Sequence, residues 1–145
     1  MRVPNVEEAL RRLRQVEGAR LGKGASEREI AEAERRLGLT FPPGYRTFLR
    51  KVGWARFDGL ALFGLGDGIP PDLDLLAAAA ERAEGVARNV LPFARDDTGA
   101  IHYLDAAHSG PYESPVYRCR PAASAAEALE NVGHDFASWL WMRLA

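Results

Sequence analysis

The stretch LGLTFPPGYRTFLRKVG, residues 37–53, decides how the first half of the chain is arranged. Gly38 is suited to the left-handed residue that ends a helix, and Phe41, which precedes a proline, favours an extended backbone. Pro43 can begin a new helix because its missing N–H would have no intrahelical partner there. We therefore predict that the two prolines turn the chain between two helices. A proline-rich docking motif would need an exposed extended run instead.

The apolar residues after the prolines have the spacing of an amphipathic helix. They fall at i, i+3, i+4 and i+7: Tyr45, Phe48, Leu49 and Val52. Other segments also carry helix signals, since Asn5 with Glu8 and Ser26 with Glu29 have the form of a reciprocal N-terminal cap. We expect helices at 5–17, 26–37, 43–52, 72–88 and 135–144, and a third cap pattern at Ser124 with Glu127.

Between these helices the sequence alternates short apolar runs with turn residues, which is typical of strands. The clearest hairpin joins 91–95 to 100–105 through a turn at 97–99, and further strands are expected around 60–64 and 115–120. Helices near both ends and strands in the middle predict an α+β fold with a mostly antiparallel sheet and helices packed on one side. A chain of 145 residues is expected to form a single domain, 1–145.

Composition argues against several classes of protein. The chain has 19 basic and 20 acidic residues, so its net charge of −1 offers no general attraction for nucleic acid or an anionic membrane. The lone Cys119 excludes an internal disulfide and a cysteine-rich zinc site. No apolar run approaches the roughly 18 residues of a membrane-spanning helix. We expect a cytoplasmic protein with no cofactor.

Few side chains could carry catalysis or bind a metal. The histidines, His102, His108 and His134, fall in three different segments, and their spacing matches no metal motif. No serine lies in a nucleophile elbow. We therefore predict a protein that is not an enzyme. The alternative, a small enzyme, would require Asp96, Asp97 and His102 to converge in a cleft.

Residues 26–54, SEREIAEAERRLGLTFPPGYRTFLRKVGW, resemble the opening motif of the SUKH superfamily, which includes a yeast cell-wall-assembly regulator and many bacterial immunity proteins. The matching positions are Ser26, Ile30, Glu34, Leu37, Gly38, Phe41, Pro42, Tyr45, Phe48 and Leu49. Blocks similar to later parts of the family follow in order: 62–66, 91–105, 114–119 and 134–140. The resemblance covers roughly residues 20–145 and leaves 1–20 as an N-terminal helix extension.

The resemblance implies an α+β domain that binds another protein without catalysis. Bacterial members similar to this chain often neutralise polymorphic toxins, commonly nucleases, by direct contact. The chain is accordingly expected to be an immunity protein or, alternatively, a stand-alone regulatory or scaffold interaction protein. A monomer or weak homo-oligomer is expected. The family has no shared catalytic residues, so Glu34 and Tyr45 are expected to define the fold.

A candidate partner surface lies in the loop HSGPYE, residues 108–113, which contains no residue that demands a core. We expect a contact patch built from Tyr112, Glu113, Asp97 and an outward-facing His102, with Trp54 or Arg56 at its margin. The alternative is a merely polar connection. Trp139 and Trp141 are a further possibility, because residues two apart on a helix cannot both face the core, and exposed tryptophans often anchor interfaces.

Overall fold

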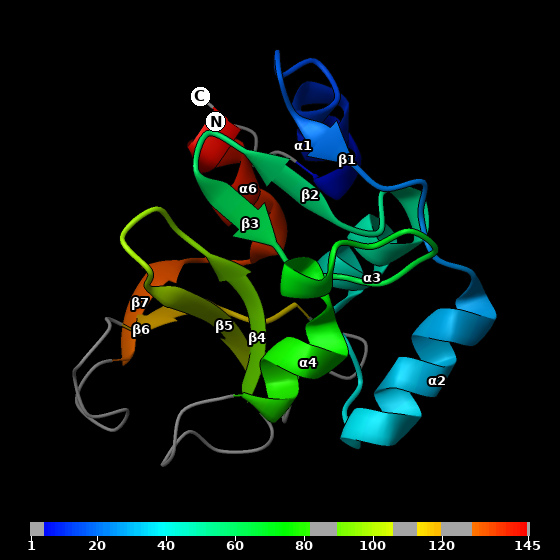
Figure 1. The fold of residues 1–145 in the computed structure, drawn as a ribbon. Coiled ribbons are helices and arrows are strands. Elements are labelled where there is room, and N and C mark those ends of the chain that lie inside the picture. Colours follow the sequence, from blue (N-terminus) through cyan, green and yellow to red (C-terminus); the bar gives the residue numbers. More distant parts are fainter. Residues whose placement is uncertain (1–4, 82–89, 106–112, 120–128, 145) are drawn as a thin grey trace.

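The computed structural model describes residues 5–81, 90–105, 113–119 and 129–144. Within them, seven strands form one sheet in which each strand pairs antiparallel with the next along the chain (Figure 1). The strands are β1 (Arg20–Leu21), β2 (Ala55–Phe57), β3 (Leu60–Leu62), β4 (Val90–Arg95), β5 (Ile101–Asp105), β6 (Val116–Cys119) and β7 (Leu129–Gly133). The antiparallel sheet and the α+β class predicted from the sequence are confirmed.

The helices of the described segments are α1 (Val6–Leu13), α2 (Glu27–Leu37), α3 (Pro43–Lys51), the short 3-10 helix η1 (Pro71–Leu73), α4 (Leu75–Ala80) and α6 (Phe136–Leu144). Helices α1, α3 and α6 contact one another behind the sheet in the view of Figure 1. Helix α2 contacts α3 on its outer side, and α4 lies beside β4. None of these helices is long and apolar enough to cross a membrane.

The corner at the two prolines forms as predicted, and Glu34 holds it in place. Gly38 ends α2 in the left-handed conformation, with φ 67°. The Glu34 carboxylate then accepts a hydrogen bond of 2.8 Å from the backbone N–H of Phe41 and lies 3.5 Å from the Arg46 guanidinium. This carboxylate therefore ties the end of α2 to the start of α3.

Aromatic side chains fill the space between α3, α6 and the sheet. Tyr45 and Phe48 are fully buried, and the Tyr45 ring lies 5.6 Å from that of Phe136 and 6.0 Å from that of Phe93. The Tyr45 hydroxyl donates a 2.7 Å hydrogen bond to the Phe63 carbonyl. A register shift between Pro92 and Ala94 marks a bulge in β4 at Phe93, whose ring lies within this core.

One expectation about the elements was wrong, and another is confirmed in part. Residues 129–133 form an edge strand on β6, whereas we expected only helix signals in this part of the chain. The expected helix over 72–88 is represented by η1 and by α4, which begins where the Asp74 carboxylate accepts from the Leu76 N–H. Residues 82–89, Ser124 and Glu127 lie outside the described residues.

Candidate protein-binding surfaces

Asp96 closes the β4–β5 turn. Its Oδ1 accepts from the backbone N–H groups of Thr98 (2.9 Å) and Ala100 (3.1 Å), and its Oδ2 accepts from Arg118 Nε at 3.0 Å. Burial alone would raise the pKa of Asp96, but the hydrogen bonds from Thr98 and Arg118 outweigh it and lower the pKa to about 2. Asp96 is therefore a paired carboxylate that organises a turn.

His102 does not face outward as the sequence analysis expected, because it is fully buried. Along β5, His102 and Leu104 face the helices, whereas we expected His102 to lie on the outer face of the sheet. The His102 ring lies 5.2 Å from Trp139 and 6.3 Å from Phe93, and its Nε2 is 3.1 Å from an Arg143 guanidinium nitrogen. Burial first, and then the charge of Arg143, lower the pKa of His102 to about 4, so the ring is neutral at pH 7.

The other residues of the predicted contact patch lie apart. Asp97 is exposed in the β4–β5 turn. This turn lies beside the β2–β3 turn, since a Cβ added to Gly59 there would be 3.0 Å from the Cβ of Asp97. Glu113 lies near the opposite end of β5, where its carboxylate accepts from the Gly44 N–H at 2.9 Å. Asp97 and Glu113 therefore do not meet in one patch, and Tyr112 lies outside the described residues.

The two marginal residues of that patch have different surroundings. Trp54 is only 9% exposed and packs in the core. Arg56 lies on the sheet face opposite the buried Ala55 and Phe57, and its guanidinium forms an ion pair with Asp72. Neither side chain is a prominent exposed anchor.

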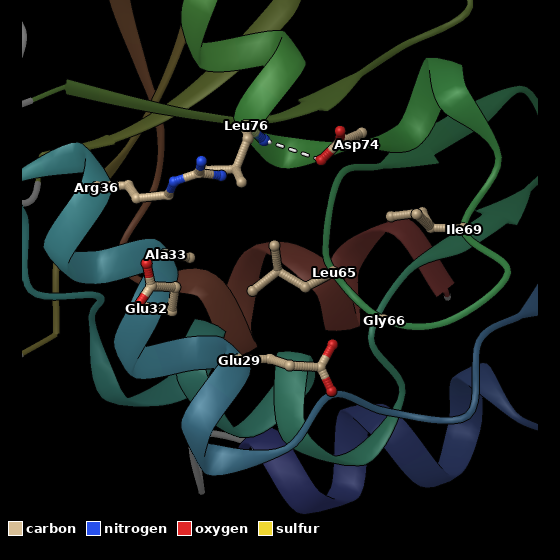
Figure 2. Close-up of a pocket in the computed structure, with 9 residues that line it drawn as sticks. All are labelled: Glu29, Glu32, Ala33, Arg36, Leu65, Gly66, Ile69, Asp74 and Leu76. Atoms are coloured by element: carbon tan, nitrogen blue, oxygen red, sulfur yellow. Dashed lines mark hydrogen bonds between the residues drawn. The ribbon is translucent and has the colours of Figure 1, made fainter.

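A groove with a volume of about 260 Å³ runs between α2 and the segment that leads from β3 into α4 (Figure 2). We call it the α2 groove. Its lining residues are Glu29, Glu32, Ala33, Arg36, Leu65, Gly66, Ile69, Asp74 and Leu76. The side chains of Leu65 and Ile69 extend from the second wall toward the space between the walls, and Arg36 extends toward Leu76 at one end. The groove therefore has an apolar floor and a charged rim.

The sequence places one face of α2 along this groove. Glu29, Glu32, Ala33 and Arg36 follow the i, i+3, i+4, i+7 spacing of a single helix face. Three carboxylates, those of Glu29, Glu32 and Asp74, line the groove against one guanidinium. Each of these carboxylates also has a partner within the fold. Glu32 pairs with Arg35, while Glu29 accepts from the Ser26 N–H and Asp74 from the Leu76 N–H. The lining of the groove is still more acidic than the nearly neutral chain, although Arg35 partly offsets the charge of Glu32.

Helix α2 is held firmly as a wall of this groove. Ser26 and Glu29 form the reciprocal cap that the sequence predicted, with hydrogen bonds of 3.1 and 3.2 Å. On the side toward α3, Glu27 pairs with Arg46 at 3.1 Å and with Arg50 at 3.2 Å. The wall therefore does not have to assemble when a ligand arrives, which lowers the entropic cost of binding.

Sequence reasoning missed the α2 groove. The glycine-rich residues that follow the expected strand at 60–64 indicate only turns, and no local pattern shows that they lie opposite α2. The one available signal was Ala33, a small buried residue between the charged positions Glu29 and Arg36 on one helix face. Such a gap in a charged face allows another segment to approach closely.

The described residues contain no group of three or more His, Cys, Asp or Glu side chains that could hold a metal ion. Several features of the fold suit a protein-binding domain: an antiparallel sheet with helices, a preformed groove, and carboxylates that already form hydrogen bonds or ion pairs within the fold. The sequence model of the SMI1/KNR4 family (SUKH-1) matches residues 24–141, and the chain belongs to this family. Domains of this family are generally protein-interaction modules without catalytic activity. No curated protein matches the chain.

Proposed function

We propose that this protein binds another protein through the α2 groove and, as an immunity protein in the cytoplasm, neutralises a nuclease-type toxin by direct contact. The observation that carries the proposal is an apolar floor beneath a rim with three carboxylates and one guanidinium. A groove of this kind suits a partner segment that presents an apolar side chain beside lysine or arginine.

The acidic rim also agrees with the proposed class of partner. Nucleases bind an anionic substrate and carry basic surfaces for it, which are accessible targets for an inhibitor. The net charge of −1 gives little long-range attraction, but steering and register at an interface depend on the charges that meet there. The carboxylates of Glu29, Glu32 and Asp74 supply this local complement.

The first test is a growth-rescue assay with the toxin-like domain of a large multidomain protein encoded beside this gene. We expect the unmodified chain to rescue cells that express that domain. Glu32→Lys with Ile69→Asp should reduce affinity for the purified domain at least tenfold and abolish rescue. Glu17→Lys is the matched control for the Glu32→Lys part of the variant, because it makes the same Glu→Lys change on an exposed residue that does not line the groove, and it should rescue fully.

Two results would count against the proposal. Rescue by the double variant would move the interface away from the α2 groove. A gene neighbourhood without a toxin-like protein would remove the immunity role and favour the alternative, a stand-alone regulatory or scaffold interaction protein. In either role we propose a chain that acts as a monomer or weak homo-oligomer.

The patch predicted from the sequence remains a secondary proposal in a reduced form. Asp97 is exposed, and Arg56 is half-exposed on the outer sheet face, so both could contact a partner at this end of the sheet. His102 is excluded by its burial, and Glu113 already serves α3. Tyr112, which lies outside the described residues, and Trp54, which is 9% exposed, stay predictions from the sequence alone. Alanine substitution of Asp97 and Arg56 should weaken binding if this surface contributes.

A further inference from the structure

A second surface, formed by α1 and the C-terminal half of α6, differs in chemistry from the α2 groove. Five residues line a hollow of about 280 Å³ between the two helices: Glu8, Arg11, Arg12, Gln15 and Trp141. Met142 follows Trp141 on α6, is turned about 100° from it around the helix axis and does not line the hollow; this residue is 70% exposed. Among the described residues it is the only large apolar side chain with such exposure. We call the five lining residues together with the neighbouring Met142 the α1–α6 surface.

Trp141 is held in a defined position on this surface. The guanidinium of Arg12 lies 5.2 Å from the centre of the Trp141 ring, and Arg12 Nε donates a 3.1 Å hydrogen bond to the Leu144 carbonyl. Trp139, two residues earlier, is buried in the core, so Trp141 is the half-buried member of the pair. A large aromatic side chain fixed in this way loses little entropy when a partner covers it.

The charge of this surface is opposite to that of the α2 groove. Arg11 and Arg12 stand against the single carboxylate of Glu8. Tryptophan, methionine and arginine are the residue types most enriched in the centres of protein interfaces, and Trp and Arg dominate their energetics. The combination suits a partner segment with acidic residues around an apolar or aromatic side chain.

From these observations we infer that the α1–α6 surface is a second protein-binding site, which takes an acidic segment of a partner with an apolar or aromatic anchor. In Figure 1, α1 and α6 lie at the opposite end of the molecule from α2 and α4, which form the α2 groove. Helix α1 also precedes the region 24–141 that matches the family, so this surface uses a segment outside that match. The chain can then contact two partners, or two parts of one partner, at the same time.

The experiment selects peptides from a random phage-displayed library on the immobilised full-length chain and measures the affinities of enriched peptides by calorimetry. We expect an acidic class with an apolar or aromatic residue. Its affinity should fall at least tenfold for Arg11→Glu with Met142→Ser. Glu32→Lys with Ile69→Asp should leave it unchanged. Arg28→Glu, which introduces the same charge change at an exposed position that lines neither site, is the matched control.

The selection also separates this inference from the proposed function. Basic peptides that lose affinity only for the Glu32→Lys with Ile69→Asp variant belong to the α2 groove. If no acidic class is enriched, or if its affinity is the same for Arg11→Glu with Met142→Ser as for the unmodified chain, the second site is refuted whatever the groove binds. Equal melting temperatures of all variants establish that lost affinity does not reflect unfolding.

Discussion

At the scale of single residues, His102 gives the protein a defined sensitivity to acid. Its pKa of about 4 in the folded chain lies below the ordinary value of 6.5. Between these values the unfolded chain binds a proton that the folded chain does not, so the free energy of unfolding falls as pH decreases from 6.5 to 4. The loss is on the order of 3 kcal/mol at most.

Denaturant unfolding at pH 7 and pH 4.5 measures this effect. His102→Gln, which cannot titrate, should lose distinctly less stability than the unmodified chain between the two pH values. The charged groups near His102 are Arg143 on α6, Arg118 on β6 and Asp96, and the pKa of Asp96 at about 2 places its own titration below this range. Equal pH dependence of the two proteins would show that the pKa of His102 is the same in the folded as in the unfolded chain, which would contradict the lowered value.

The residue scale also shows what the sequence can and cannot predict. The family positions Glu34 and Tyr45 were expected to define the fold, and each has a bond that explains why: one to the Phe41 N–H, the other to the Phe63 carbonyl. The orientation of His102 could not be inferred. Alternation along β5 fixes two faces but does not say which one meets the helices, and Tyr103 on the other face is buried as well. The burial of His102 among helical residues depends on the rings of Phe93 and Trp139 that pack around it.

At the scale of elements, no residue next to the start of α3 caps this helix, and the distant residue Glu113 does so instead. Pro42 at the cap position makes no side-chain hydrogen bond, but the Glu113 carboxylate accepts from the Gly44 N–H at 2.9 Å. The helix dipole favours a negative group at this end. A Cβ on Gly44 would lie 3.2 Å from both carboxylate oxygens, so glycine leaves room for this contact.

We expect Glu113→Ala to lower the free energy of unfolding by roughly 0.5–2 kcal/mol, as for other lost caps. Burial, together with the charge of Asp135, raises the pKa of Glu113 above its ordinary value, although the hydrogen bond from Gly44 opposes this shift. Glu113→Gln keeps the acceptor and removes only the charge, so it should cost less than alanine at pH 7. Chemical denaturation of the three proteins checks the order, and a neutral Glu113→Ala would contradict the capping role.

Helices and strands were predicted correctly where the sequence signal that specifies them is local. The caps at Asn5 and Ser26 and the prolines before α3 act within one turn, and these helices begin where expected. Strands β1 and β7 were missed because each exists only through pairing with another strand, β2 in one case and β6 in the other. Sheet edges of this kind are set by tertiary contacts that no short pattern records.

At the scale of the whole molecule, both proposed binding surfaces arise between segments that are distant in the sequence. The α2 groove joins residues 29–36 to 65–76, and the α1–α6 surface joins residues 8–15 to 141–142. Local sequence patterns predicted the helices that contribute to each surface. They did not predict which other segment of the chain lies across from each helix. Predicting the overall fold class therefore succeeded, whereas placing the binding surfaces required the three-dimensional arrangement.

Whether α1 belongs to the same cooperative unit as the family region is the remaining question at this scale. The family match begins at residue 24, but α1 contributes Ala9, Leu10 and Leu13 to the main core, each with at most 1% exposure. We propose that residues 1–145 fold as one domain.

Leu10→Ala should then lower the free energy of unfolding by about 2–5 kcal/mol, as for buried leucines elsewhere. Arg11→Ala, on the exposed side of α1, should cost less than about 0.5 kcal/mol. Urea unfolding followed by circular dichroism and by tryptophan fluorescence should give coincident transitions that shift together in Leu10→Ala. A variant that loosens α1 while the midpoint of the remaining transition stays unchanged would instead make residues 1–20 an appended helix.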